Sequence, residues 1–474
     1  MKKLLTITML TLIVLASRAA DQPFVHPLFS DNMVLQRDRK VLVWGWTEPG
    51  KEVVVSMEGK RATAKADANG KWTVQLGPFK AGGPFTLIIE GSQKVELKDV
   101  LVGDVWVCSG QSNMEQGIGI SLNPQQEIAN ANYPQIRLFT VPKRVAYEPQ
   151  STVKSQWLVC TPQTVANGGW GGFSAVGYYF GRHLHQELKV PIGLIHTSWG
   201  GTVAEAWTSK EAVSTIPAFE KSVEKLATPP QKQDNPNVVT VLYNGMIAPL
   251  LPYGIKGAIW YQGESNASRA KQYQTLLPTM IRDWRARFGS GDFPFLIVSL
   301  ANFMATKPEP TKSQWAELRE AQALTAQTLR NCGLAIAIDI GDEKDIHPKN
   351  KQDVGRRLGL VAQAIAYGQK IVSSGPVYRS MKIKGNTVRL SFDHIGGGLV
   401  AKGDKLQGFA IAGDDKKYVW ADAVIEKDTI VVSSPKVEKP VSVHYAWADN
   451  PVCNLYNKAG LPAVPFRADG QAKK

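Results

Sequence analysis

From residue 101 to residue 367 the sequence alternates short apolar runs with segments of helical length, and this pattern limits the possible folds more than any other feature. The apolar runs do not alternate with polar residues, as is typical of strands buried on both faces. Parallel strands need a crossover connection, which is usually a helix. The pattern therefore predicts an α/β fold in which helices cover both faces of a parallel sheet. The predicted strands are 104–108, 192–197, 257–261, 293–300 and 333–340, and the predicted helices are 174–188, 270–288, 313–329 and 352–367.

The segments on either side of this region have no helical periodicity. Between residues 41 and 100, and again after residue 376, short runs rich in Val, Ile and Thr are separated by turns such as Asn69-Gly70 and Gly385-Asn386. A chain of 474 residues has room for about two to four domains. Whether the last region is a separate module or packs with the first stays open. We predict a flanking antiparallel β-sandwich at 21–100, an α/β domain at 101–375 and a β-region at 376–474.

The first twenty residues have the composition of a secretory signal peptide. Lys2 and Lys3 precede an apolar run at 4–16, and Ser17-Arg18-Ala19 places small residues where a signal peptidase cuts. The run is shorter than the roughly 20 apolar residues that a membrane-spanning helix needs. We therefore predict that residues 1–20 are removed and that the protein is periplasmic or secreted, with no membrane span.

Charge and cysteine content argue against several classes of protein. The formal charge is +14, or +11 without Lys2, Lys3 and Arg18, and the basic residues are scattered. A solvated basic surface explains this charge, and so does a field that attracts acidic sugars. Nucleic acid is not an expected partner, because there is no basic helix or aromatic-interleaved basic stripe. The four cysteines form no CxxC pair, which excludes the usual zinc-ribbon and thioredoxin-like motifs but allows one disulfide.

Polar segments follow four of the predicted strands. In open parallel sheets ligands bind outside the carboxyl ends of the strands, so these segments form the candidate site. They are Ser109-Gly110-Gln111-Ser112-Asn113-Met114, Ser198-Trp199-Gly200-Gly201-Thr202, Gln262-Gly263-Glu264-Ser265-Asn266 and Asp342-Glu343-Lys344-Asp345-Ile346-His347-Pro348.

Together these segments offer the parts of a serine esterase, which needs a nucleophile on a tight turn, a base, a group that orients the base, and oxyanion donors. Ser112 is the predicted nucleophile, because it follows a buried strand and Gly110 permits a tight turn. The alternative is that Ser109 and Ser112 only cap a helix. His347, one of seven histidines, is the predicted base, on a loop at the same edge of the sheet.

Asp345 is the predicted group that orients His347, because it lies two residues earlier and can accept a hydrogen bond from Nδ1. Asp342 and Glu343 are nearly as close in sequence. A third alternative is a Ser–His pair helped by a backbone carbonyl.

The predicted oxyanion donors are two backbone N–H groups and one side-chain amide. They are the N–H of Ser112, the N–H of Gly201 or Gly200, and the amide of Asn266. A plain turn also explains the glycines, and an N-cap explains Asn266.

Further side chains at the strand ends are candidates for binding a substrate. The polar ones are Gln111, Gln262 and Glu264, although Glu264 could instead bind the backbone of neighbouring loops. The aromatic ones are Trp170, Trp199 and Tyr261, each of which either stacks on a sugar or lies in the core.

Three of these segments, in this order and at about this spacing, resemble the sialate O-acetylesterases of the SGNH hydrolase superfamily. The matching segments are 109–114, 260–266 and 345–348, and the likeness extends to Leu35-Gln36-Arg37 and to 445–467. The resemblance implies a flavodoxin-like three-layer α/β/α hydrolase domain that removes acetyl esters from sialic acids, with Ser112 as nucleophile and His347 as base. Two features depart from the superfamily pattern. Many members carry Asp where this chain has Lys344, and their Gly-x-Asn-Asp block is replaced here by Gly263-Glu264-Ser265-Asn266.

The predicted reaction is a two-step acyl transfer from an O-acetylated sialic acid or another acetylated glycan, and it needs no metal or organic cofactor. A neutral-glycan acetylesterase, such as an acetyl xylan esterase, uses the same chemistry and stays open. A non-catalytic glycan-binding protein built on the β-regions is less favoured, because it leaves the polar strand ends unexplained. A metallophosphoesterase with ligands near Asp345 and His347 is disfavoured, because few other histidines are present.

Overall fold

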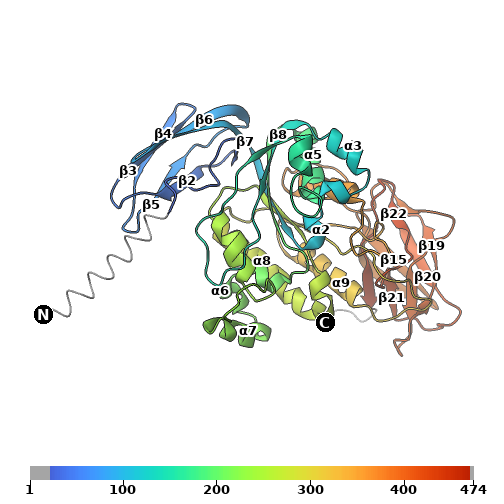
Figure 1. Cartoon of the computed structure of the whole chain (residues 1–474). Helices are drawn as coiled ribbons and strands as arrows, with labels where there is room; N and C mark the ends of the chain where they lie inside the picture. The colour runs from blue at the N-terminus through green and yellow to red at the C-terminus, as the bar shows by residue number, and fades with distance from the viewer. Residues whose placement is uncertain (1–21, 470–474) are drawn as a thin grey trace.

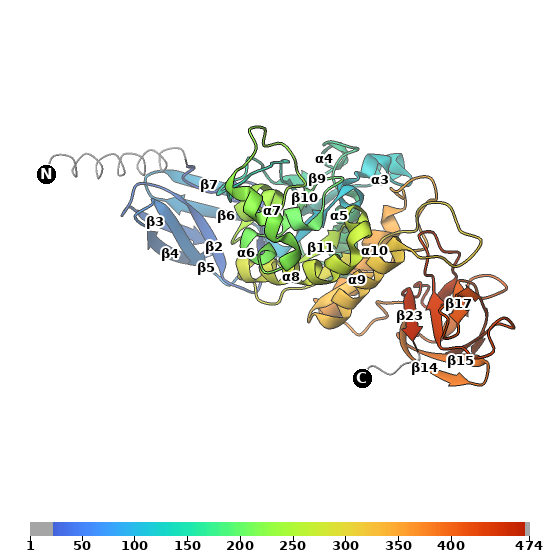
Figure 2. The same ribbon diagram turned by 90° about the horizontal axis from the view of Figure 1, so that it is seen from below.

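The computed structural model describes residues 22–469, and the predicted signal peptide at 1–20 lies outside them. Figure 1 shows strands near the N-terminus in blue, a central part in which strands and helices alternate, and strands near the C-terminus in red. The two strand-rich regions lie at opposite ends of the central part (Figure 1 and Figure 2). Within the described residues, no helix is both long and apolar enough to cross a membrane.

The central sheet confirms the predicted α/β fold. Its strands lie in the order β13-β12-β11-β7-β10-β8-β9, and each neighbouring pair is parallel except β8 with β9 at one edge. The apolar pattern does not reveal β8 and β9, because β8 begins with Tyr133-Pro134-Gln135 and β9 has only three residues. The strands are β7 (Lys94–Gly110), β8 (Tyr133–Thr140), β9 (Leu158–Cys160), β10 (Ile192–Ser198), β11 (Gly257–Tyr261), β12 (Phe295–Val298) and β13 (Cys332–Ala335).

Helices pack on both faces of this sheet. Along β7, Val105 belongs to one buried cluster and Trp106 to another, because successive side chains of a strand point to opposite faces. On the Trp106 face lie α5 (Ala175–Leu188) and α10 (Lys351–Ile365), and on the Val105 face lie α8 (Ala270–Phe288) and α9 (Gln314–Thr328).

These four helices are the predicted ones, and the first residues of α5, α9 and α10 follow from local capping. The hydroxyls of Ser174 and Ser313 accept the N–H of Gly177 and Ala316, so α5 and α9 each begin one residue later than predicted. Asn350 caps α10 in the same way. The short helical segments between them are α2 (Ser112–Glu115), η1 (Ile118–Ile120), α3 (Pro124–Ala129), α4 (Pro162–Ala166), η2 (Ala204–Trp207), α6 (Lys210–Val213), η3 (Pro217–Phe219), α7 (Glu220–Glu224), η4 (Lys225–Ala227), η5 (Tyr243–Ile247), η6 (Ala248–Leu250) and η7 (Glu264–Arg269).

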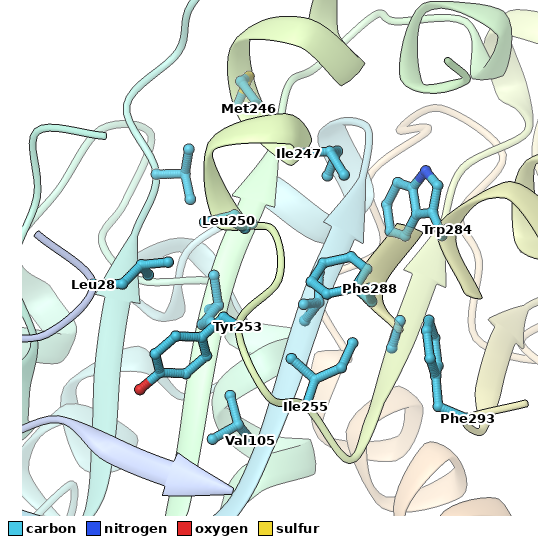
Figure 3. Packing of buried hydrophobic residues seen from close by; sticks show 14 of the residues in the cluster. Leu28, Val105, Met246, Ile247, Leu250, Tyr253, Ile255, Trp284, Phe288 and Phe293 are labelled. Carbon is cyan, nitrogen blue, oxygen red and sulfur yellow. The ribbon is translucent and has the colours of Figure 1, made fainter. Parts of the chain in front are cut away.

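The core on the Val105 face contains large side chains. Figure 3 shows Trp284 and Phe288 of α8 near Ile255 and the strand that carries Val105. Trp284 is fully buried, and its indole N–H donates to the carbonyl of Trp207 at 2.9 Å. Burial of a side chain such as Phe288 contributes ~1.5–3 kcal/mol, so this packing fixes the strands whose ends carry the polar segments.

β7 runs without interruption from the N-terminal strands into the central sheet. Its first part pairs antiparallel with β6 (Gly82–Glu90), and its last part pairs parallel with β10 and β11. The predicted boundary at residue 101 therefore falls inside one strand. Where β7 enters the central sheet, the buried Asp104 accepts two hydrogen bonds from Arg37, at 3.0 and 2.9 Å, and one from Tyr367, at 2.9 Å.

The strands of the N-terminal region pair antiparallel, except β1, which pairs parallel with β7. β5 shows a strict alternation of exposed and buried residues, as expected of a strand with one face in solvent. β2 pairs with β5, and β3 pairs with both β4 and β6. The strands are β1 (Val34–Gln36), β2 (Val41–Trp46), β3 (Glu52–Met57), β4 (Lys60–Lys65) and β5 (Lys71–Leu76).

The C-terminal strands pack against the central part rather than against the N-terminal strands. Ile336 and Ile338, which were expected to extend β13, belong to the core of the C-terminal region. The predicted strand at 333–340 therefore ends early, at Ala335. The C-terminal strands are β14 (Val377–Lys384), β15 (Thr387–Asp393), β16 (Leu399–Ala401), β17 (Phe409–Ala412), β18 (Val419–Trp420), β19 (Asp422–Glu426), β20 (Thr429–Ser433), β21 (Ser442–Tyr445), β22 (Leu455–Asn457) and β23 (Phe466–Asp469).

All four cysteines carry free thiols, so the disulfide that the sequence allows is not formed. Cys108, Cys160 and Cys332 are buried, and burial raises the pKa of the Cys160 and Cys332 thiols to about 12. Thiols in such surroundings are unreactive, so we assign them to packing.

Candidate active site

Ser112 lies on a sharp turn at the carboxyl end of β7. Gly110 has φ of +142°, and a Cβ atom added there would lie 2.1 Å from the carbonyl oxygen of Tyr261. Only glycine permits this close approach. The chain then turns, the N–H of Gln111 donates to Tyr261 at 3.0 Å, and Ser112 begins the four-residue helix α2.

The structure does not support the alternative in which Ser109 and Ser112 cap this helix. The N-cap residue is Gln111, and it makes no side-chain capping bond. Ser109 is fully buried inside β7, and its hydroxyl has no hydrogen-bond partner among residues 22–469. Ser112 is half-buried, so its hydroxyl remains within reach of a ligand.

His347 lies on the loop between β13 and α10. Its Nδ1 is 3.4 Å from Oδ1 of Asp345, which also accepts the backbone N–H of His347 at 2.8 Å. Asp342 instead accepts the backbone N–H of Lys344, so Asp345 is the neighbouring carboxylate that contacts the imidazole. The Asp345 side chain is 52% exposed, and an exposed pair of this kind is worth only ~0–1 kcal/mol.

The surroundings of His347 favour its neutral form. Partial burial lowers the pKa of His347, and the ammonium of Lys351 acts in the same direction, while Asp345 acts to raise it. The ring of Trp170 lies edge to face with the imidazole, at 4.8 Å between centroids. A base must be neutral before it can accept a proton, so a lowered pKa keeps His347 ready near neutral pH.

Asn113 joins the segment of Ser112 to the segment of His347. Its side-chain Nδ2 donates to the carbonyl of Ile346 at 3.0 Å and to Oε1 of Glu264 at 2.6 Å. Its Oδ1 accepts a hydrogen bond from Nζ of Lys351 at 2.6 Å. The buried amide of Asn113, the residue after Ser112, thus bonds both the residue before His347 and a third strand end.

Lys351 and Glu264 are charged groups at this junction. Lys351 is fully buried, and burial lowers its pKa to about 7, although the carboxylates of Glu264 and Asp345 act to raise it. Burial also raises the pKa of Glu264, whose Oε2 has no hydrogen-bond partner among the described residues. Ionisable groups with shifted pKa values beside a half-buried serine are typical of a catalytic centre.

Gly200, the first of the two glycines after β10, lies directly against Ser112. A Cβ atom added at Gly200 would lie 3.2 Å from Cβ of Ser112. The N–H of Gly200 donates to Oε2 of Glu115 at 2.6 Å, and the other oxygen of Glu115 pairs with Lys143 at 2.5 Å. Gly201 has φ of +74°, and its N–H meets no backbone acceptor within residues 22–469, so of the two glycines it is the one left to bind an oxyanion.

The contacts of Asn266 argue against its predicted role as an oxyanion donor. The residue is 1% exposed, and its Nδ2 donates to Oε2 of Glu205 at 2.9 Å. Its Oδ1 accepts the N–H of Ala204 and Nε2 of Gln262, at 3.0 and 2.6 Å. The side chain therefore ties two loops together beneath the surface.

The predicted substrate-binding residues divide into buried and accessible ones. Gln262 is fully buried in a network with Asn266 and Tyr273, and Tyr261 is also fully buried, which places both in the core. Gln111 is 3% exposed and accepts the N–H groups of Gly263 and Ser265, at 3.4 and 3.3 Å. Trp170 is 42% exposed beside His347, and Trp199 is half-buried beneath Lys143, so both rings remain candidates for stacking on a sugar.

No group of three or more His, Cys, Asp or Glu residues suited to a metal ion occurs among residues 22–469. Asp339 is instead held by two hydrogen bonds from Arg357, at 2.6 and 2.7 Å, and one from Tyr456, at 2.9 Å. The described residues therefore offer no ready ligand set for the metallophosphoesterase alternative.

Sequence reasoning missed the roles of Asn113, Lys351 and Glu115. Asn113 lies inside a segment that was singled out, but nothing local shows that its amide reaches a residue 233 positions away. Lys351 follows His347 by four residues, and a lysine there is ordinarily a surface residue. Only the three-dimensional contacts reveal these side chains.

Residues 102–364 match the family model described as carbohydrate esterase, sialic acid-specific acetylesterase. The chain is 32% identical to a sialate O-acetylesterase of Pongo abelii and 31% identical to one of Homo sapiens, in each case over 97% of this chain and 95% of the relative. The fold is similar to the crystal structure of a carbohydrate acetylesterase from Xanthomonas citri. That likeness has a TM-score of 0.86 and 41% sequence identity, and it covers 95% of this chain and all of the other.

Proposed function

The chain belongs to the carbohydrate esterase family of sialic acid-specific acetylesterases, and on this premise we propose that it removes O-acetyl groups from sialic acids with Ser112 as nucleophile and His347 as base. The observation that carries the proposal is the hydrogen bond from Asn113 to the carbonyl of Ile346, which joins the Ser112 turn to the His347 loop at the carboxyl edge of the sheet. Both residues lie in segments whose order and spacing resemble those of the sialate O-acetylesterases.

The reaction proceeds in two steps. His347 takes the proton of the Ser112 hydroxyl, and the serine oxygen attacks the carbonyl carbon of the acetyl group. The N–H groups of Ser112 and Gly201 stabilise the oxyanion, a role in which each donor is worth about 100- to 1000-fold in rate. The sugar hydroxyl leaves with a proton from His347. Water then attacks the acetyl-enzyme by the same route and releases acetate.

Asp345 orients His347 in this proposal, but weakly. The distance of 3.4 Å and the exposed carboxylate support a minor electrostatic role rather than the buried partner of a full triad. The active site therefore works mainly as a Ser112–His347 pair, and Asn113 and the carbonyl of Ile346 hold its second member in place.

A neutral-glycan acetylesterase is the second candidate function. The structure from Xanthomonas citri that shares 41% identity is described as a carbohydrate acetylesterase, without mention of sialic acid. Equal amounts of enzyme acting on an O-acetylated sialic acid and on acetylated xylan separate the two functions. Faster acetate release from xylan would favour the second.

The finer features of architecture and location belong to the same proposal. The helices on both faces of the central sheet support a flavodoxin-like three-layer SGNH hydrolase domain at 101–375, flanked by antiparallel β-sandwich regions at 21–100 and 376–474. The composition of residues 1–20 supports export and removal of that segment, to give a periplasmic or secreted enzyme. Mass spectrometry of the N-terminus of the protein recovered from cells tests the cleavage.

Acetate release from an O-acetylated sialic acid by the full chain and three variants tests the proposal. We expect Ser112→Ala and His347→Ala each to lower kcat/KM by at least about 1000-fold. The matched control is Ser109→Ala, which removes a buried hydroxyl without a partner three residues before the nucleophile.

Circular dichroism shows whether each variant is folded. If folded Ser112→Ala keeps most of its activity, the nucleophile is wrong. If the wild-type protein releases acetate from no acetylated sugar, the esterase hypothesis is wrong and a non-catalytic glycan-binding protein becomes the favoured function.

A further inference from the structure

The C-terminal region forms two neighbouring cavities on either side of Trp420. One has a volume of about 490 Å³ and the other of about 520 Å³, and Gly408 and Trp420 line both. Volumes of this size fall within the range of small-molecule and sugar sites. The larger one, called here the basic cavity, is lined by lysines 312, 416 and 417 and by the rings of Tyr418, Trp420, His444 and Trp447.

The rings of the basic cavity are held in place rather than loosely exposed. The indole N–H of Trp420 donates to the carbonyl of Pro308 at 2.6 Å, although the side chain is 42% exposed. The ring of Tyr418 stacks on His444 at 3.8 Å with an angle of 18°, and its hydroxyl shares a hydrogen bond of 2.7 Å with Ser442. Aromatic side chains that are already held in place lose little conformational entropy when a ligand binds. Such rings favour a ligand with flat apolar faces.

The charge of the basic cavity is positive. Three lysines line it, and no carboxylate belongs to its lining. Lys416 pairs with Asp469 at 3.1 Å, whereas Lys312 and Lys417 form no ion pair with any residue of the described chain. Two lysines without an ion pair among the described residues therefore line the space beside aromatic rings, and a carboxylate would give their ammonium groups charge-assisted hydrogen bonds.

The loop that lines part of the basic cavity begins at the edge of the sheet that carries the candidate active site. Pro310, Thr311 and Lys312 lie on the loop that follows β12. Earlier in the same loop, Asn302 accepts the N–H of Gly341 at 2.6 Å, and Phe303 forms a β-bridge with Asp342, on the loop that carries His347. A glycan bound in the basic cavity would thus rest on a segment that also contacts the catalytic loop.

We propose that the basic cavity is a second, non-catalytic site for a carboxylate-bearing sugar, in which aromatic rings contact the sugar face and Lys312 and Lys417 bind the carboxylate. Apolar faces edged by hydroxyl groups and one negative charge describe both sialic and uronic acids. Sialic and uronic acids therefore both carry the chemical groups that the lining of the basic cavity would bind. The site would keep an acidic glycan near the enzyme independently of the acetyl group.

Titration of the full chain carrying Ser112→Ala tests this site, with binding measured by calorimetry. The probes are 3′-sialyllactose, digalacturonic acid and the neutral sugar lactose. We expect at least one acidic sugar to bind and lactose to bind at least about tenfold more weakly. Binding of sialyllactose alone would identify a sialic acid site, and binding of digalacturonic acid alone would identify a uronic acid site.

Two variants locate the binding. Trp420→Ala, and the double change of Lys312→Met with Lys417→Met, should each weaken the acidic sugar at least about tenfold. The matched control changes Lys382→Met and Lys384→Met, two exposed lysines of β14, which alter the net charge equally and should leave affinity unchanged. In the chain with Ser112 intact, all of these changes should leave acetate release from a small acetylated substrate within about twofold of wild type.

The proposal is overturned if neither acidic sugar binds, if lactose binds as well as they do, or if the lysine double variant binds like the control. Because binding is measured without the nucleophile, failure here leaves the esterase assignment untouched. Loss of esterase activity likewise leaves this binding result untouched.

Discussion

Ser112 follows a strand whose last eleven residues are all buried, whereas His347 lies on a loop in which the four residues at 342–345 are all exposed. The turn at Ser112 is set by its neighbours in sequence, above all by the close approach of Gly110 to Tyr261. His347 depends on partners from other parts of the chain, since the carbonyl before it is bound by Asn113 and its exposed neighbour Asp345 contributes little.

This difference shows that the two members of the proposed catalytic pair are held in place by different means. A nucleophile can be positioned by a rigid strand and one glycine. A base on an exposed loop needs a buried hydrogen-bond partner, because an exposed ion pair contributes too little free energy to hold the loop in place. Asn113 is that partner, and Lys351 holds Asn113 in turn.

We expect Asn113→Ala to have the largest effect, because it removes the only side chain in the described chain that bonds both Ile346 and Glu264. Misplacement of a catalytic group by about 1 Å can cost about 100-fold in rate, and we expect kcat to fall by about that factor with a smaller change in KM. Steady-state acetate release measures both. The control is Asn130→Ala, an exposed asparagine at the end of α3. Activity within about twofold of wild type would show that the loop holds His347 unaided.

Lys351→Met removes the hydrogen-bond donor to Asn113 but keeps a long side chain, and we expect a smaller effect. Loss of one hydrogen bond from a charged group should lower kcat/KM by about tenfold. Lys351 also acts to lower the pKa of His347, so its removal should move the acid limb of the pH profile to higher pH. Lys344→Met, on the exposed part of the same loop, is the control. An unshifted acid limb would contradict the electrostatic role of Lys351.

Asp345→Asn is expected to have the smallest effect. An exposed pair contributes ~0–1 kcal/mol, so kcat/KM should fall by no more than about fivefold. Asp345 acts to raise the pKa of His347, so its removal should move the acid limb to lower pH, opposite to Lys351→Met. Asp342→Asn tests the neighbouring carboxylate under the same assay. A loss of about 1000-fold for Asp345→Asn would make it a full triad member and overturn the weak role assigned here.

The sequence predictions were accurate where the deciding interactions are local in the chain, and they were wrong where those interactions join residues far apart in sequence. The helices 174–188 and 270–288 were predictable because their ends are marked by a capping serine and by Gly289. The end of β13 was not, because Ile336 and Ile338 are as apolar as strand residues but pack on C-terminal strands. The burial of Asn266 was equally hidden, since an asparagine before a helix has the same sequence signature as a cap.

The order of residues alone was enough to predict the α/β fold, to place Ser112 and His347 after strands of the sheet, and to indicate the family. These features depend on periodicity and on contiguous motifs, which the order of residues records directly. Only the tertiary structure decided which carboxylate meets His347, which amide joins it to the nucleophile, and that three lysines and four aromatic rings meet in one cavity. Those outcomes depend on contacts between residues far apart in the chain, and local sequence preferences do not encode such distances.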